Sequence, residues 1–138
     1  MLRLTRRYRF AALHRLQAPH LSEAGNRALY GKCANPYGHG HDYVLEVSVR
    51  GPVEAISGRV ADPRMLDGLV AGQVLGAFQH QDLNAALGAV PTTENLAVEI
   101  RRRLLGSWKG AFPGQWPRLE RVRLGETPRN LVEVIETL

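Results

Sequence analysis

The sequence predicts an α+β domain, in which a four-stranded antiparallel sheet carries two helices on one face. Three observations lead to this fold class. Apolar and polar residues alternate near both ends of the chain, which is the period of a strand. In the middle, apolar residues recur every three or four positions, which is the period of a helix. The length of 138 residues fits one domain, residues 1–138.

The first strand is expected over residues 2–16, where apolar positions alternate from Leu2 to Ala12 and Arg6 interrupts their face. Five arginines precede the first acidic residue: Arg3, Arg6, Arg7, Arg9 and Arg15. Nucleic-acid binding and a transit peptide are two interpretations of such a start. The strand period argues against a transit peptide, which is an amphipathic helix. We favour arginines on the solvent side of an edge strand, with attraction of an anionic substrate as an addition.

A long loop is expected next, because residues 17–38 are rich in Gly, Pro, Asn and Ser and show no periodicity. Loops of this length in a small domain are usually functional or disordered. The second strand is expected from His39 to Arg50, where side chains alternate well, and Gly51-Pro52 ends it.

Two helices are expected in the middle of the chain. Asp62-Pro63 is typical of a helix start, and apolar residues at helical spacing continue to about Gln79. Pro91-Thr92-Thr93-Glu94 opens the second helix with a threonine cap and an acid in the first turn, and Gly106 lies at its end.

The last two strands are expected over residues 119–124 and 131–137, on either side of a turn at residues 125–130. A sheet of four strands has two exposed edges, and proteins tend to cover such edges. We therefore expect oligomerisation through the sheet edges.

Three histidines form a candidate metal site. His39 and His41 are two positions apart and share one face of a strand, and His14 lies in phase with Phe10 and Ala12. Three neutral imidazoles that converge from paired strands would bind zinc and leave a fourth position open, as catalytic sites do. Another divalent metal is an alternative. Pairs at this spacing also arise by chance, and single histidines are more often structural.

Three further residues are candidates for chemistry. Cys33 is either a small buried hydrophobic residue or, beside Lys32 and a metal site, a thiol of lowered pKa that acts as a base or nucleophile. His80 is a candidate general acid or base if it approaches Cys33. Glu126 lies on an apolar strand face and needs a donor, either an arginine such as Arg129 or an N–H pair of a ligand.

The composition, 44% hydrophobic and 22% charged, is that of a globular protein. No apolar run reaches the roughly 20 residues of a membrane span, so no membrane association is expected. The single cysteine excludes an internal disulfide and fits a reducing compartment, so we expect a cytoplasmic location. The net charge of +5 by itself is weak support for a nucleic-acid partner.

Four segments, in this order, resemble the 6-pyruvoyltetrahydropterin synthase / 6-carboxytetrahydropterin synthase family. They are residues 10–16 (FAALHRL), 33–43 (CANPYGHGHDY), 91–97 (PTTENLA) and 125–130 (GETPRN). The combination of Cys-x5-His-Gly-His, a distant histidine and the Thr-Thr-Glu-Asn block is specific, and the segments span nearly the whole chain.

The resemblance implies the tunnelling fold (T-fold), in which sheets of three subunits close a barrel and two trimers stack into a homohexamer with sites at subunit interfaces. It implies a substrate, 7,8-dihydroneopterin triphosphate, and Cys33 as the base that abstracts a carbon-bound proton. The implied zinc ligands are His14, His39 and His41. Glu126 would anchor the pterin ring, His80 would be the catalytic histidine, and the residues nearby would be Thr92, Thr93 and Glu94.

The chain departs from the family pattern at Gln79, where an aspartate usually completes a Cys-Asp-His set. A glutamine can orient His80 through its carbonyl, but it does not stabilise an imidazolium as a carboxylate does. We count Gln79 with Cys33 and His80 as the catalytic candidates.

The predicted function is zinc-dependent formation of 6-pyruvoyltetrahydropterin with release of triphosphate, a phosphorus–oxygen lyase reaction of tetrahydrobiopterin biosynthesis. The five residues between Cys33 and His39 favour it. One alternative is 6-carboxytetrahydropterin synthase of queuosine biosynthesis, a carbon–carbon lyase. The other, motivated by Gln79, is a catalytically weakened pterin-binding homologue.

Overall fold

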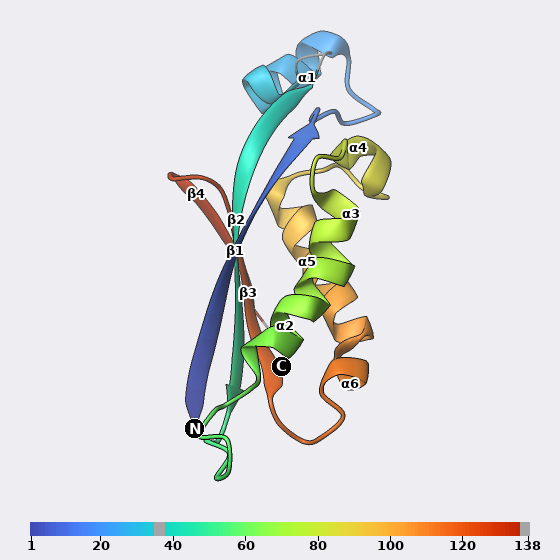
Figure 1. Cartoon of the computed structure of the whole chain (residues 1–138). Helices are drawn as coiled ribbons and strands as arrows, with labels where there is room; N and C mark the ends of the chain where they lie inside the picture. Colours follow the sequence, from blue (N-terminus) through green and yellow to red (C-terminus); the bar gives the residue numbers. More distant parts are fainter. Residues whose placement is uncertain (35–37, 136–138) are drawn as a thin grey trace.

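The four predicted strands form one antiparallel sheet in the order β1-β2-β3-β4 (Figure 1). The computed structural model describes residues 1–34 and 38–135, without the side chain of His39. The strands are β1 (Leu2–His14), β2 (His39–Gly51), β3 (Arg118–Thr127) and β4 (Asn130–Val134). The predicted α+β class and the four-stranded antiparallel sheet are therefore confirmed, and the strand order is a meander. The expected end of the last strand is wrong at residue 135, and residues 136–138 lie outside the described residues.

Two helical segments lie side by side on the same face of the sheet, as predicted (Figure 1). The first runs through α2 (Pro63–Val70), a π-helical turn η2 (Ala71–Leu75) and α3 (Gly76–Phe78), and the second is α5 (Thr93–Gly106). The predicted caps form, because the side chain of Asp62 accepts from Arg64 N and that of Thr92 accepts from Asn95 N. No helix in the described residues has the length and apolar character needed to cross a bilayer.

The core lies between these helices and the sheet. The alternating residues of β2 are fully buried from Tyr43 to Val49, and they pack with Leu66, Ile100 and Leu124 of the surrounding elements. Burial of one strand face fixes the register, since a slip by one residue would expose every one of these side chains. His14 and His41 lie on this buried face, at the end of the sheet nearest α1.

The segment 17–38 is not simply a loop, which corrects the expectation. It contains α1 (Glu23–Tyr30), capped by Ser22, and a 3-10 turn η1 (Gly31–Ala34). The only residue that α1 buries is Asn26, so the helix has no apolar stripe from which to recognise it. The Asn26 side chain instead bonds the backbone of Ala18, Leu21 and Ser22. Residues 35–37 lie outside the described residues.

Two short helices, α4 (Leu83–Ala86) and α6 (Trp108–Ala111), were also not expected.

The first strand ends at His14 rather than at residue 16, because beyond His14 the backbone of β1 bonds a side chain instead of a neighbouring strand. Asn84 accepts from Arg15 N at 2.6 Å and donates to Arg15 O at 2.7 Å. This bidentate contact fixes the end of β1 immediately after His14.

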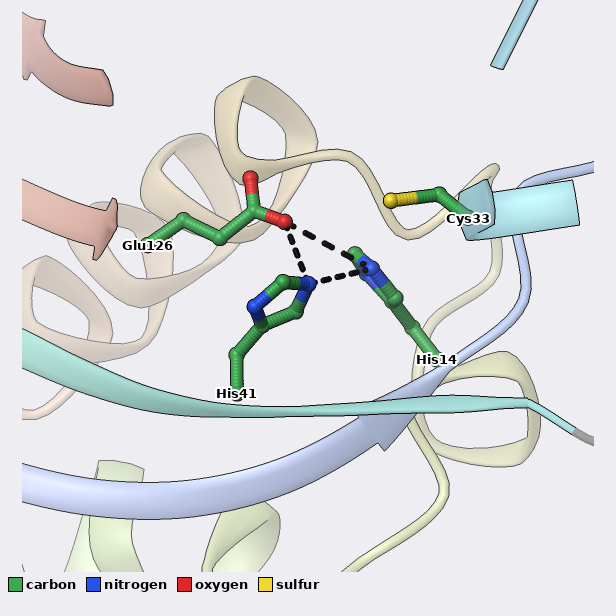
Figure 2. A group of neighbouring side chains, drawn as sticks. All are labelled: His14, Cys33, His41 and Glu126. Carbon is green, nitrogen blue, oxygen red and sulfur yellow. Dashed lines mark hydrogen bonds and ion pairs between the residues drawn. The ribbon is translucent and has the colours of Figure 1, made fainter. Parts of the chain in front are cut away.

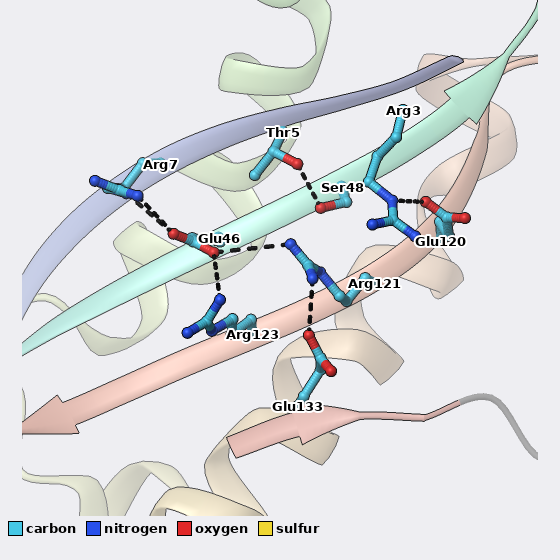
Figure 3. Close-up of polar contacts among 9 residues, drawn as sticks. All are labelled: Arg3, Thr5, Arg7, Glu46, Ser48, Glu120, Arg121, Arg123 and Glu133. Carbon is cyan, nitrogen blue, oxygen red and sulfur yellow. Dashed lines mark hydrogen bonds and ion pairs between the residues drawn. The ribbon is translucent and has the colours of Figure 1, made fainter. Parts of the chain in front are cut away.

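The arginines of β1 lie as the edge-strand interpretation predicts, apart from Arg6. Arg3 and Arg7 project from the sheet face that carries no helix and pair with Glu120 and Glu46 (Figure 3). Arg6 lies on the helical side and forms a bidentate pair with Asp67 of α2, at 3.1 and 2.6 Å. The charge of Arg6, which interrupts the apolar face of β1, is thus paired with the Asp67 carboxylate, 61 residues further along the chain.

Candidate metal centre

Four potential metal ligands from four parts of the chain meet at one end of the sheet. His14, Cys33, His41 and Glu126 each offer one ligand atom, and these atoms all lie within 4.8 Å of one another (Figure 2). His14 comes from the end of β1, His41 from β2, Cys33 from η1 and Glu126 from β3. The predicted convergence of His14 and His41 is therefore found. His39 pairs with His14 in the β1–β2 register, but its side chain lies outside the described residues.

His14 is fully buried and its ring orientation is fixed by the backbone. Its Nδ1 lies 2.9 Å from the carbonyl oxygen of Pro91, which only accepts, so Nδ1 carries the proton. The lone pair is then on Nε2, which lies 3.0 Å from His41 Nε2. A histidine that binds metal through one ring nitrogen usually donates a hydrogen bond from the other, often to a backbone carbonyl, and this bond fixes the ring orientation. Sequence reasoning missed this role of Pro91, because every residue has a backbone carbonyl and the residue type therefore carries no signal for it.

Glu126 completes the polar cluster. Its Oε1 lies 2.6 Å from His41 Nε2 and 3.6 Å from His14 Nε2, and its Oε2 accepts from Thr93 Oγ1 at 2.5 Å. A β-bulge directs this side chain, because the β3–β4 register shifts between Gly125 and Thr127. Of the two partners expected for Glu126, the arginine is wrong. Arg129 and Glu126 both line one small cavity, but in the part of the chain that the structure describes they form no ion pair with each other.

Cys33 is partly buried beside the histidines. A bond of 2.6 Å from Leu16 N to Cys33 O ties η1 to the chain that follows β1. Burial raises the pKa of the Cys33 thiol, the Glu126 carboxylate raises it further, and Lys32 lowers it. Lys32 acts in the expected direction, but by itself it does not bring the thiol pKa below its usual value. A cation bound in the cluster would offset the field of Glu126 and favour the thiolate.

The donor set fits a zinc ion. Imidazole nitrogen, thiolate sulfur and carboxylate oxygen are all zinc ligands. A tetrahedral ion with Zn–N distances of about 2.0–2.1 Å separates two ligand nitrogens by roughly 3.3 Å. The Nε2 atoms of His14 and His41 are 3.0 Å apart, so a shift of a few tenths of an ångström would accommodate the ion.

Gln79 and His80 lie against the outer edge of β1, in a segment that is hydrogen-bonded to Ala11 and Leu13, and outside this cluster. His80 N donates to Ala11 O at 2.6 Å, and His80 has a φ of 58°, in the left-handed region that costs energy in a non-glycine residue. His80 lines a cavity of about 540 Å³ together with His41 and Gly40. The structure does not place His80 among the groups that cluster with Cys33.

Gln79 orients His80 in the opposite sense to the one expected. Its carbonyl Oε1 accepts from Ala11 N at 3.1 Å, so its amide nitrogen faces His80 Nε2 at 3.4 Å. Because an amide NH₂ only donates, this contact is a hydrogen bond only in the tautomer whose ring proton is on Nδ1. Gln79 thus faces His80 with its amide nitrogen, and the contact favours that tautomer.

The two threonines at the start of α5 have different partners. Thr92 caps the helix, whereas Thr93 donates to Glu126. Thr93, Glu94 and Glu126 line a cavity of about 340 Å³, with residues 129–132 on the other side. The sequence did not separate the roles of Thr92 and Thr93, because the two residue types are the same and only the fold brings Glu126 close.

A meander sheet with helices on one face and a partly buried His-Cys-His-Glu cluster define a T-fold protein with a candidate metal site. The model of the 6-pyruvoyl tetrahydropterin synthase family matches residues 3–137, and the chain belongs to this family.

Individual relatives agree with this assignment. The chain is 35% identical over 133 residues to 6-pyruvoyl tetrahydrobiopterin synthase of Poecilia reticulata, covering 94% of this chain and 86% of the relative. The structure of Caenorhabditis elegans 6-pyruvoyl tetrahydropterin synthase superposes with a TM-score of 0.85 at 33% identity, over 99% of this chain and 96% of that one. A 6-carboxy-5,6,7,8-tetrahydropterin synthase of Rickettsia bellii is 28% identical over 153 aligned positions, covering 97% of this chain and all of the relative.

Proposed function

We propose that this chain converts 7,8-dihydroneopterin triphosphate to 6-pyruvoyltetrahydropterin and releases triphosphate, as a phosphorus–oxygen lyase. The observation that carries the proposal is the meeting of His14, His41, Cys33 and Glu126 within 4.8 Å. In this assignment residues 1–138 form one pterin synthase-type domain.

Zinc is the proposed cofactor, held by His14, His39 and His41. The Nδ1–H of His14 on Pro91 O supports this assignment, because it places the ring lone pair on Nε2, the nitrogen that faces the other potential ligands. Bound zinc would supply Lewis-acid polarisation of a substrate side-chain oxygen, which acidifies the neighbouring C–H. Cys33, whose Sγ borders the imidazoles, takes that proton as its thiolate.

Glu126 is the proposed anchor of the pterin ring. A carboxylate accepts two parallel N–H bonds from a planar amidine-like group, and such charge-assisted pairs fix orientation. The Thr93 hydroxyl holds Oε2 of Glu126, and Glu94 borders the adjoining cavity. Thr92 is proposed to act only through the start of α5, since its hydroxyl is the cap.

The position of His80 supports a homohexamer with sites between subunits. As the proposed catalytic histidine it must reach the reacting atoms, yet in one chain it lies with Gln79 in the segment that covers the outer edge of β1 at Ala11 and Leu13. A neighbouring subunit that packs against this side of the sheet would bring its own Cys33 to His80. Light scattering on the purified protein tests the assembly, and a monomer would contradict it.

6-Carboxytetrahydropterin synthesis is the second candidate. The same fold and cluster serve it, and the relative from Rickettsia bellii carries that name. The higher identity to 6-pyruvoyl enzymes, 35% against 28%, and the five residues between Cys33 and His39 favour the pyruvoyl product. A catalytically weakened pterin-binding homologue is the third, and Gln79 motivates it.

One experiment separates the three candidates. Purified protein of known metal content is incubated with 7,8-dihydroneopterin triphosphate, and the products are identified by mass spectrometry. Pyruvoyl-pterin with triphosphate supports the proposal, and carboxy-pterin with acetaldehyde supports the second candidate. Tight pterin binding without turnover supports the third. Elemental analysis is expected to find about one zinc per chain, and a protein that takes up no metal would contradict the cofactor assignment.

A further inference from the structure

A further cavity, separate from the two described above, lies at the opposite end of the sheet from the metal centre. It has a volume of about 580 Å³ and is bordered by α6, the end of β2 and the start of β3. Figure 1 shows α6 at the end of the molecule remote from α1. Nine residues of β2 separate His41 from Arg50 at the cavity, which corresponds to roughly 30 Å along the strand. A ligand here would not contact the metal centre.

The inner wall of this cavity is apolar and well fixed. Trp108 and Phe112 are buried, with ring centroids 4.9 Å apart. The indole N–H of Trp108 donates to Pro117 O at 3.0 Å, which ties α6 to the segment that leads into β3. Leu105 and Leu119 complete the apolar part. A wall of this kind accommodates the flat apolar part of a small ligand.

The polar part of the lining is mainly cationic. Arg50, Lys109 and Arg118 line the cavity together with Gln115, and its lining contains no carboxylate. In the part of the chain that the structure describes, none of the three cations forms an ion pair. Arg50 helps to lower the pKa of the nearby Glu120 carboxyl, whose side chain is hydrogen-bonded to Arg3. Lys109 and Arg118 are therefore two positive charges without a paired carboxylate, and Arg50 adds a third that Glu120 partly offsets.

One of these cations is held in place. The Arg118 guanidinium lies over the Trp116 ring, 4.7 Å from its centroid, and Arg118 Nε donates to Gln115 O at 3.4 Å. Its terminal nitrogens are left to bind a ligand, and a fixed guanidinium fork matches phosphate oxygens in a bidentate manner.

From these observations we infer that this cavity is a binding site for a phosphorylated small molecule with a planar ring, the chemistry of a nucleotide. Three cations, two of them without a paired carboxylate, match an anion with more than one charge, which a phosphate chain supplies and a single carboxylate does not. The apolar wall next to them receives the ring. The inference does not depend on the proposed reaction, and its test measures no turnover.

Intrinsic tryptophan fluorescence reports on this site directly. The chain has two tryptophans, Trp108 in the wall and Trp116 beneath Arg118. The protein is titrated with ATP, with inorganic triphosphate and with adenosine. We expect ATP to change the fluorescence with saturation, inorganic triphosphate to bind more weakly, and adenosine to bind least. Equal affinity for ATP and inorganic triphosphate would overturn the assignment of a ring site.

Single substitutions test the cations. Arg118→Gln and Lys109→Gln are expected to weaken ATP binding about tenfold each, with circular dichroism unchanged because both side chains are exposed. Arg64→Gln, which removes one exposed charge from α2, is the matched control and should leave the affinity within twofold. Equal weakening by Arg64→Gln would show attraction by net charge alone and overturn the site. Absence of any fluorescence change, or tighter binding of an RNA oligonucleotide than of ATP, would overturn it as well.

Discussion

Thr93→Val should weaken binding of 7,8-dihydroneopterin triphosphate about tenfold while the protein stays folded. Thr93 is 3% exposed, and its hydroxyl donates to Glu126 Oε2 at 2.5 Å. Valine keeps the shape of threonine and removes the donor. A hydrogen bond to a charged group contributes about 1.5–3 kcal/mol, and the lower value corresponds to about tenfold in affinity. The loss should raise KM more than it lowers kcat, because Glu126 is the proposed anchor and not the base.

Thr92→Ala is the matched control. The Thr92 hydroxyl accepts from Asn95 N at 3.1 Å and caps α5, so its removal should cost about 1 kcal/mol of stability. It should leave KM unchanged. Steady-state kinetics and urea unfolding of both variants at equal zinc content measure the two effects separately. The reasoning would be refuted by an unchanged KM in Thr93→Val, or by an equal rise in KM in Thr92→Ala.

Three further predictions concern catalysis and stability. Cys33→Ala should retain zinc and lose turnover, and loss of zinc on elemental analysis would make Cys33 a ligand instead of the base. Gln79→Asp should raise turnover at unchanged zinc content, because a carboxylate stabilises an imidazolium that the Gln79 amide nitrogen does not; an unchanged or lower rate contradicts this. Asp67→Asn should lower the urea midpoint at neutral pH. Arg6 lowers the Asp67 pKa below its usual 3.8, so the native pair contributes above that value and loses its effect as the pH falls through the lowered pKa. The difference between Asp67→Asn and wild type should therefore shrink in acid, and a difference independent of pH would contradict the pairing.

The regular elements were predictable because their signals are local. The period of two from Tyr43 to Val49 specified the buried face of β2, and the caps at Asp62 and Thr92 specified where two helices begin. The shared face of His14 and His41 followed from the same period. These features depend on residues a few positions apart, which a sequence shows directly.

The helix α1 was not predictable in this way. It is held by the amide of Asn26, which bonds three backbone positions, and not by an apolar stripe. A segment stabilised by polar contacts of one side chain has no period in the sequence. The composition of residues 17–38 therefore suggested a loop.

Local patterns in the sequence were enough to predict the buried strand faces, the starts of α2 and α5, and the two histidines of the cluster, His14 and His41. Which groups these residues contact follows only from the packing of the fold. Pro91 O fixes the His14 proton from 77 residues away, Thr93 holds Glu126 across 33 residues, and the Ala11 amide turns Gln79 toward His80 across 68. Hydrogen bonds are directional and act over about 3 Å, so which groups meet depends on how the sheet and helices pack, and no local pattern records it.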